Sequence, residues 1–263
     1  MFLDRMNYLE VEEYLKTKDT VIIVTGSTEN HGKHMPLGTD TFIPHKIIEL
    51  VNEKVGDEVV IAPTLPYGCT EDLLGFARTV SVGPELLTQM LNKICGQLFD
   101  YGFRHFIIVN GHGGNSKPIE ATAHYVYKLG GRLARVDWWL IAGQINPAWK
   151  GGHGGGEETA GVMAVDESLV KMEYINEGEN PRNDLGDELP SSNSWNSVNF
   201  KGGLIAIPRP IEDITDNGWF AYGMPDAPSR ANAKWGTEMV EGMADYIADF
   251  IPVFARIKMP EKN

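Results

Sequence analysis

VIIVTG, residues 21–26, reads as a short buried strand, because β-branched residues follow one another and a glycine closes the run. Three further segments contain candidate strands: EVVIAPTLPYG (58–68), where the strand runs into a loop punctuated by Pro and Gly, HFIIVNG (105–111) and RLARVDWW (132–139). Apolar residues at helical spacing predict helices between them, over 44–54, 84–102 and 116–129, with Pro44 and Pro84 at two of the starts. Continuous apolar strands alternating with helices predict a three-layer α/β fold, in which helices cover both faces of a mostly parallel sheet.

The pattern loosens after residue 139. Residues 146–156 are rich in glycine, a short helix is expected from Glu157, a late strand over 203–211, and a closing helix over 229–250. Residues 172–203 are polar and show no period, which is too long for an ordinary connection. This segment is interpreted as a lid or an oligomerisation arm, with an irregular excursion as the alternative. Residues 1–263 are taken as a single domain.

Composition excludes several classes of protein. The formal net charge of -13 and the lack of a Lys/Arg stripe argue against nucleic-acid binding. The N-terminus is charged throughout, unlike a signal peptide, and the longest apolar runs are too short to span a membrane. Cys69 and Cys95 form no CxxC pair and are expected to be reduced thiols. A cytoplasmic protein is the default expectation.

Histidines and carboxylates gather at the predicted strand ends. Glu29 and His31 follow the strand at 21–26, two residues apart, so an extended chain points both to one side, and Asp40 comes nine residues later. This segment lies at the carboxyl end of a parallel strand, where open α/β sheets bind ligands. Mixed carboxylate and imidazole ligands suit Zn, Mn or Fe better than Ca or Mg.

Two glycine-rich motifs extend this set. NGHGGN (110–115) places His112 directly after the strand at 105–109; the alternative is a tight turn in which Asn115 caps the next helix. HGGGEET (153–159) holds His153 in a glycine run and Glu158 at a helix start, where Glu157 or Glu158 could instead serve the helix dipole. His45, His105 and His124 are interpreted as structural or surface residues. His34 lies nearer the motifs and is a candidate substrate contact.

Three stretches, GSTENHGKHMPLGTDTFIP (26–44), VNGHGGN (109–115) and HGGGEET (153–159), resemble the creatininase family, and GWFAYGMPDAPSRANAKWG (218–236) resembles its C-terminal segment. The resemblance implies a dinuclear site, often Zn or Mn, with Fe a further option. Asp40 matches the carboxylate that bridges both ions, Glu29 and His112 match the ligands of one, and His31 and Glu158 match those of the other. Glu157 could replace Glu158. His153 matches a histidine that shuttles a proton, and hexamers are implied.

The chain departs from the creatinine-hydrolysing members around the expected pocket. Gly113 and Gly114 replace an aromatic residue and a Glu after the metal-binding histidine, so an extra ligand is missing. Trp149 matches a Trp that closes over the substrate, but Lys150 beside it replaces an acid, which favours a neutral or anionic substrate. FART (76–79) replaces FPGT and places Arg78 near the pocket. These departures argue against creatinine itself.

The resemblance therefore implies a hydrolase in which two ions lower the pKa of a water and polarise a carbonyl, while His153 and Glu158 serve catalysis. The substrate is expected to be a small polar cyclic amide or formamide. The alternatives are ring-opening C–C hydrolysis of an inositol-derived cyclic diketone, of the 3-dehydro-scyllo-inosose type, and a non-catalytic metal-binding scaffold.

Overall fold

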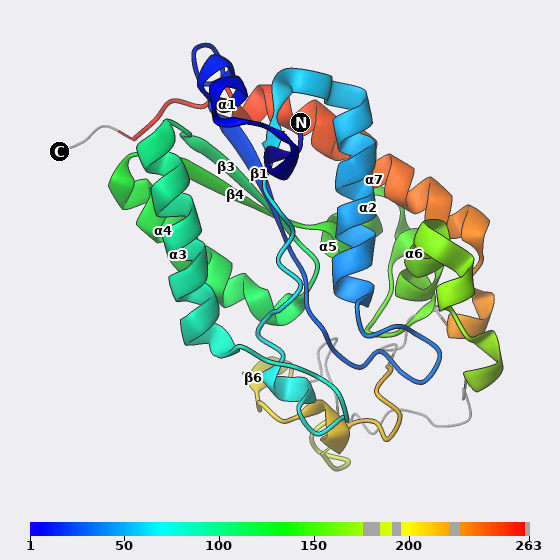
Figure 1. The fold of residues 1–263 in the computed structure, drawn as a ribbon. Helices are drawn as coiled ribbons and strands as arrows, with labels where there is room; N and C mark the ends of the chain where they lie inside the picture. The colour runs from blue at the N-terminus through cyan, green and yellow to red at the C-terminus, as the bar shows by residue number, and fades with distance from the viewer. Residues whose placement is uncertain (176–184, 191–195, 221–226, 261–263) are drawn as a thin grey trace.

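The central element is a parallel sheet of four strands, seen in a computed structural model that describes residues 1–175, 185–190, 196–220 and 227–260. The strands are β1 (Thr20–Thr25), β2 (Val60–Ile61), β3 (His105–Asn110) and β4 (Arg132–Asp137), in the spatial order β2-β1-β3-β4. Helices lie on both faces of this sheet (Figure 1), which confirms the predicted three-layer α/β fold.

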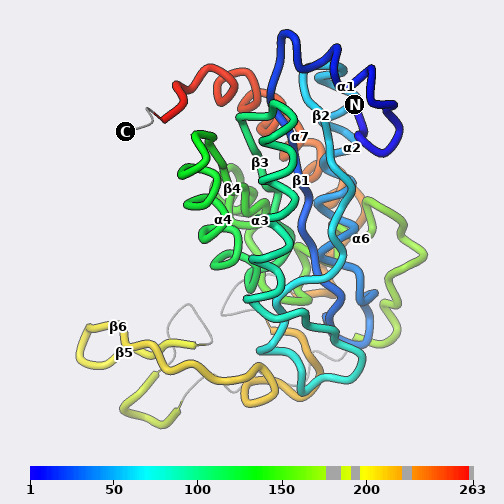
Figure 2. The backbone as a smooth tube through the Cα atoms, turned by 60° about the vertical axis from the view of Figure 1, so that its left-hand side comes forward, coloured from blue at the N-terminus to red at the C-terminus, as the bar shows by residue number. Residues whose placement is uncertain are grey.

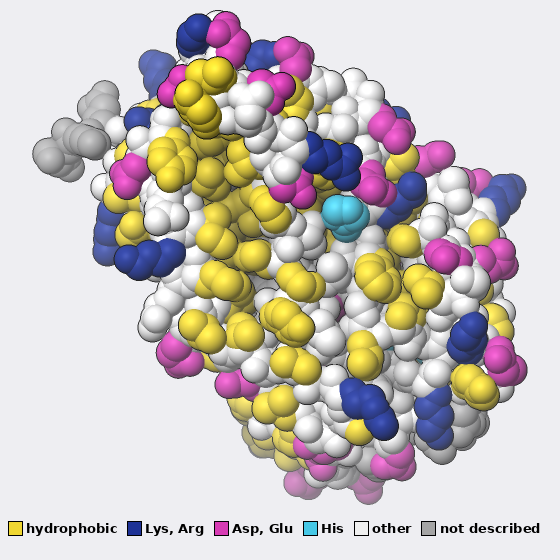
Figure 3. Space-filling view, in the orientation of Figure 1, with side chains coloured by type: hydrophobic (Ala, Val, Ile, Leu, Met, Phe, Trp, Pro, Cys, Tyr) yellow, Lys and Arg dark blue, Asp and Glu magenta, His cyan; other side chains and the backbone are white. Residues whose placement is uncertain are grey.

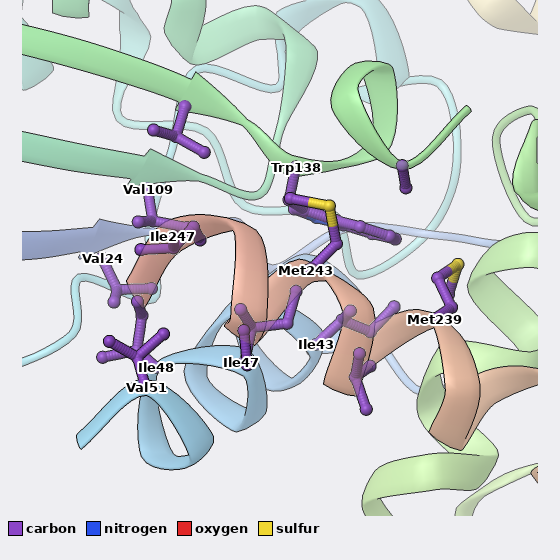
Figure 4. Close-up of a cluster of buried hydrophobic side chains, with 14 of the residues drawn as sticks. Val24, Ile43, Ile47, Ile48, Val51, Val109, Trp138, Met239, Met243 and Ile247 are labelled. Carbon is purple, nitrogen blue, oxygen red and sulfur yellow. The ribbon is translucent and has the colours of Figure 1, made fainter. Parts of the chain in front are cut away.

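The helices divide between the two faces. Those in the described part of the chain are α1 (Tyr8–Tyr14), α2 (Thr39–Val55), α3 (Gly83–Tyr101), α4 (Ser116–Leu129), α5 (Trp138–Ile145), α6 (Gly156–Asp166) and α7 (Ala233–Phe254). In β1, Ile22 and Val24 join the apolar cluster that contains residues of α2 and α7 (Figure 4). Val21 and Ile23 join the cluster on the other face, with residues of α3 and α4. Two covered faces explain why β1 is apolar without alternation.

Prolines limit the second strand. The sequence predicts a strand that runs into a Pro/Gly loop within 58–68; the strand is Val60–Ile61, and Pro63 and Pro66, which cannot donate to a ladder, follow it. Leu65, between the two prolines, still reaches β1: its N–H donates to the Val24 carbonyl at 2.9 Å, and its carbonyl accepts from Gly26 at 2.8 Å. The segment after β2 therefore follows β1 toward its carboxyl end.

Other boundaries also differ from the expectation. α2 begins at Thr39 rather than at Pro44, so Asp40 lies in its first turn. The strand expected over 132–139 ends at Asp137, and Trp138 starts α5. α7 begins at Ala233, later than expected, and continues past Pro252. These differences move the ends of elements but leave their order unchanged.

The late strand does not join the central sheet. β6 (Gly203–Ala206) pairs only with β5 (Ser197–Phe200), as an antiparallel hairpin. Figure 2 shows this hairpin set away from the central sheet, at the lower left. Parts of the predicted arm at 172–203, residues 176–184 and 191–195, lie outside the described residues. Among the helices that the structure describes, none has the length and apolar character needed to cross a bilayer.

The strand order creates a topological switch point at the carboxyl ends of the central strands. β2 and β3 lie on opposite sides of β1, so the chain changes direction across the sheet after β2. The carboxyl ends of β1 and β3 are adjacent, with Thr25 paired to Asn110. Open α/β sheets bind ligands at such a switch point, and the loops after these two strands carry Glu29, His31 and His112.

Candidate metal centre

Six side chains converge at this switch point. Three overlapping groups each bring their ligand atoms within 4.8 Å of one another: Glu29, His31 and His153; Glu29, Asp40 and His112; His31, Asp40 and Glu158. The loops after β1 and β3 and the first turns of α2 and α6 supply all of them except His153, which precedes α6. All five predicted ligands therefore belong to one cluster.

Asp40 joins the two histidine-containing halves of this cluster. Its Oδ1 lies 2.9 Å from His31 Nε2, and its Oδ2 lies 3.0 Å from His112 Nδ1. The hydroxyl of Ser27 also donates to Oδ2, at 2.9 Å. One carboxylate that faces two imidazoles with different oxygens has the geometry to serve two neighbouring cations.

Each of the three histidines in the cluster has one ring nitrogen near a backbone carbonyl. His31 Nδ1 lies 3.2 Å from the carbonyl of Glu29, His112 Nε2 lies 2.8 Å from that of Cys69, and His153 Nε2 lies 2.7 Å from that of Asn30. A carbonyl only accepts, so these nitrogens carry hydrogen. The other nitrogen of each ring faces the cluster, as in metal-binding histidines whose outer N–H is held by the protein.

The surroundings of Glu29 indicate whether a cation fits this cluster. Its side chain is fully buried, and neither carboxylate oxygen has a hydrogen-bond partner among the described residues, although Oε2 lies 3.1 Å from His112 Nδ1. A buried carboxylate without donors is unfavourable unless a positive charge compensates it. A divalent cation between Glu29, Asp40 and His112 would supply that charge, so the residues present fit a metal site.

The pKa shifts within the cluster also reflect its concentration of buried carboxylates. Burial disfavours the charged form of His31, but the charges of Asp40 and Glu158 raise its pKa to about 10. Burial would raise the pKa of Asp40, yet the charge of His31 and hydrogen bonds from both histidines hold it well below its usual range. Burial raises the pKa of Glu29, and that of Glu158 to about 8. Without a metal, protons on the histidines balance the negative charge of the carboxylates. A bound cation would displace these protons.

His153 is held neutral beside the cluster. Burial and the charge of His31 lower its pKa to about 3. Its ring stacks on His31, with centroids 4.2 Å apart, and on Phe220, at 5.4 Å. Because Nε2 donates to Asn30, the free lone pair is on Nδ1, which lies 3.7 Å from Glu29 Oε1. The neutral imidazole therefore presents Nδ1 to the carboxylates as a hydrogen-bond acceptor.

The structure separates the two adjacent glutamates of α6. Glu158 Oε2 lies 3.5 Å from His31 Nε2 and accepts a hydrogen bond from the backbone N–H of Gly154 at 2.6 Å. Glu157 is also buried but belongs to none of the three groups. Of the two residues that the sequence left open, Glu158 is the one placed in the cluster.

The predicted substrate contacts lie in different surroundings. The indole of Trp149 packs over Gly242 of α7, the side chain of Lys150 lies against Gly143 of α5, and Arg78 is exposed with a positive φ of 72°. His34 is buried, with Nε2 3.1 Å from the Thr159 hydroxyl. A methyl group on Gly113 would meet no described atom within 4 Å, whereas Gly114 packs against Cys69. None of these six residues belongs to the three metal groups, and their contact with substrate stays a prediction.

Several supporting residues were not predicted. Asn115 was weighed as a helix cap, and that interpretation is wrong: its side chain makes no cap hydrogen bond and binds Cys69 and Gly26 instead. Cys69 and Asn30 act through backbone carbonyls, so residue type carried no signal for them. Ser27 lies in the motif after β1, and its position in GSTE was the one available signal.

Fold and site together define an α/β protein with a carboxylate and histidine centre suited to divalent cations. The family model described as creatinine amidohydrolase matches residues 4–251. The chain therefore belongs to the creatininase family of hydrolases.

Relatives with different activities cover most of the chain. The mycofactocin precursor peptide peptidase of Mycolicibacterium smegmatis is 30% identical over 240 residues, which are 88% of this chain and 85% of that protein. The 3-dehydro-scyllo-inosose hydrolase of Thermotoga maritima is 26% identical and covers 99% of this chain and 86% of its own. A solved structure named creatininase Mn aligns with a TM-score of 0.72 at 21% identity, over 97% of this chain and 99% of that one, which supports the fold. Another creatininase structure is of a Zn-Zn type.

Proposed function

We propose that this chain is a dinuclear metal-dependent hydrolase that cleaves the C–N bond of a small polar cyclic amide or formamide. The observation that carries the proposal is Asp40, whose two oxygens face His31 and His112 separately. Glu29 and His112 would hold one ion, His31 and Glu158 the other, and Asp40 both. Zn and Mn suit these ligands, and Fe is a further option. When bound, such ions lower the pKa of water toward neutrality and polarise a carbonyl.

The side chains around the ions would guide the proton. His153 Nδ1 takes a proton from the attacking water and returns it to the leaving nitrogen, while Asn30 holds the ring through Nε2. Its stacking between His31 and Phe220 keeps the ring in this orientation. Glu158 would help His31 hold the second ion; its Oε2 accepts from the N–H of Gly154 and lies 3.5 Å from His31 Nε2.

Open space at Gly113 gives the substrate room beside His112. The proposed substrate contacts remain Trp149, Lys150, Arg78, His34 and the Gly113-Gly114 pair. Arg78 and Lys150 favour a neutral or anionic substrate over creatinine. On the face drawn in Figure 3, Lys and Arg are scattered among Asp and Glu and form no stripe.

A second candidate is ring-opening C–C hydrolysis of an inositol-derived cyclic diketone. The similarity to the inosose hydrolase of Thermotoga maritima, over 99% of this chain, favours it. Ions held by the same side chains would stabilise the oxyanion formed from a ketone. A metal-binding scaffold without activity is the third alternative, and the neutral His153 beside the cluster argues against it.

One screen separates these candidates. Protein loaded with Mn²⁺ or Zn²⁺ is incubated with polar lactams, formamides, short peptides and cyclic diketones, and mass spectrometry follows the gain of one water. We expect turnover of a lactam or formamide. Turnover confined to diketones would replace the proposal with the second candidate, turnover confined to peptides would make the chain a peptidase, and none with any class would favour the scaffold.

We also propose that the chain forms a homo-oligomer, a hexamer by its family resemblance. The β5–β6 hairpin exposes Phe200, Leu204 and Ile205, at 40%, 69% and 45% of their surface. A two-stranded hairpin alone is marginally stable in water, so a covering partner would stabilise it. Light scattering during size-exclusion chromatography tests this: Leu204→Asp should shift an oligomer toward smaller species, and a monomeric wild type would contradict it.

A further inference from the structure

The backbone carbonyl of Cys69 orients a predicted metal ligand. It lies 2.8 Å from His112 Nε2 and accepts the hydrogen of that nitrogen. His112 Nδ1 is thereby left to face Asp40 and Glu29, at 3.0 and 3.1 Å. The orientation of His112 thus depends on where a loop that follows β2 places one peptide group.

Asn115 holds that peptide group in place. Its Oδ1 accepts from the N–H of Cys69 at 2.9 Å, and its Nδ2 donates to the carbonyl of Gly26 at 3.0 Å. The side chain is fully buried and does not cap α4. One amide therefore ties the loop after β2 to the end of β1. The fit is close, because a Cβ on Gly68 would lie 2.5 Å from Asn115 Oδ1.

Gly114 lets the Cys69 carbonyl approach His112. A Cβ at position 114 would lie 2.0 Å from the Cys69 oxygen and 2.6 Å from His112 Nε2, both closer than real contacts permit. No side chain fits there unless the loop moves. A glutamate at this position could therefore not add a metal ligand without breaking the contact that orients His112.

We propose that Asn115, Cys69 and Gly114 form a clamp that fixes the tautomer and orientation of His112, with Asn115 as its positioning residue. This inference rests on the proposed metal site. The clamp acts on one ion only, because His112 shares a group with Glu29 and Asp40, whereas the other ion would be held by His31, Asp40 and Glu158. Losing such outer contacts typically reduces metal affinity about 10- to 100-fold.

Gly114→Ala and Gly113→Ala form a matched pair for the test. They are neighbours in one loop, and neither glycine has a positive φ, so alanine adds no backbone strain at either. Only the methyl group at position 114 meets the Cys69 carbonyl. Asn115→Asp keeps the acceptor for Cys69 but loses the donor to Gly26, and it breaks the clamp from the other side.

The measurement is competition for Zn²⁺ against a chromophoric chelator, with thermal unfolding followed in parallel. We expect Gly114→Ala and Asn115→Asp to weaken one of the two binding events about 10- to 100-fold and to spare the other, while Gly113→Ala leaves both unchanged. A merely structural clamp would lower the melting temperature without this split. Should Asn115→Asp fail to fold, Gly114→Ala still decides the question.

Two results would overturn the inference: unchanged affinities in both variants, or an equal loss in Gly113→Ala. Either result leaves the proposed function intact if the wild type still binds Zn²⁺. A wild type that binds no Zn²⁺ would remove the proposed function and the clamp together, so the two failures are distinguishable.

Discussion

Histidine meets carboxylate at both ends of the central sheet, and the two arrangements differ in what surrounds the pair. At the amino end of β3, His105 Nδ1 lies 2.7 Å from Asp19 Oδ1, and Nε2 lies 3.2 Å from the carbonyl of Ile257. Both ring nitrogens of His105 thus have a protein partner. At the carboxyl end, three carboxylates face one ring nitrogen each of His31, His112 and His153, and Glu29 has no hydrogen-bond partner in the described part of the chain.

This difference separates a structural pair from a candidate metal site. His105 and Asp19 satisfy each other and fasten the segment after α7 to the sheet. The cluster around Asp40 leaves the buried carboxylate of Glu29 without a hydrogen-bond partner among the described residues and would be completed by cations. A histidine beside a carboxylate is therefore weak evidence for a metal site until the partners of both groups have been counted.

The largest effect is expected from changing Asp40. Asp40→Asn removes the negative charge that the two sets of metal ligands share. It should reduce turnover on the order of 10³-fold, since ions of this kind contribute several kcal/mol to the stabilisation of the transition state. Steady-state kinetics with added Mn²⁺ or Zn²⁺ measures this. Asp19→Asn, at the other end, should retain wild-type turnover; an equal loss in both variants would erase the distinction between the ends.

A smaller effect is expected from His153→Ala. General acid–base catalysis is typically lost by about 10²-fold or more, while the two ions, held by other residues, stay bound. Kinetics and metal content measured on one preparation test the two halves of this statement. Full turnover in the variant would remove His153 from the mechanism, and lost metal would make it a ligand instead.

The smallest effect is expected at the amino end of the sheet, where His105 pairs with Asp19. Burial lowers the pKa of His105, but hydrogen bonds to Asp19 and Ile257 and the charge of Asp19 outweigh it, so the pKa is raised above 6.5. A raised folded pKa stabilises the protein fully below about 6.5, and this contribution is lost as pH rises through the folded value. His105→Gln should therefore cost about 1 kcal/mol at pH 6 and less at high pH.

Urea unfolding of metal-loaded wild type and His105→Gln, compared from pH 6 to pH 9, measures that difference. The metal ligands contribute equally to the free energy of unfolding of both proteins, since they are distant from His105, so their contributions cancel in the comparison. A difference that stays constant or grows with pH would contradict the assignment of His105. Turnover should be unchanged in this variant.

Continuous apolar strands made the fold predictable. β1 and β3 are buried on both faces, so their sequences alone indicated a parallel sheet covered by helices. Boundaries were less predictable where a side chain gives no stop or start signal. Gly38 precedes α2 without a capping side chain, so Pro44 was mistaken for the start of the helix. Trp138 extends an apolar run but starts α5, because tertiary packing overrides propensity there.

The candidate ligands could be predicted because their chemistry depends on residue type. Glu29, His31, Asp40, His112 and Glu158 are the side chains that the motifs and the resemblance indicated, and they belong to one cluster. The clamp could not be predicted in the same way. Cys69 contributes a carbonyl that any residue carries, and Asn115 in sequence is equally typical of a helix cap.

Metal content is the most direct test of the account. Wild type, Asp40→Asn and Asp19→Asn are loaded with Zn²⁺, exchanged into metal-free buffer and measured by inductively coupled plasma mass spectrometry. We expect two ions per chain in wild type and Asp19→Asn, and a near-complete loss in Asp40→Asn. Equal metal content in wild type and Asp40→Asn would contradict it.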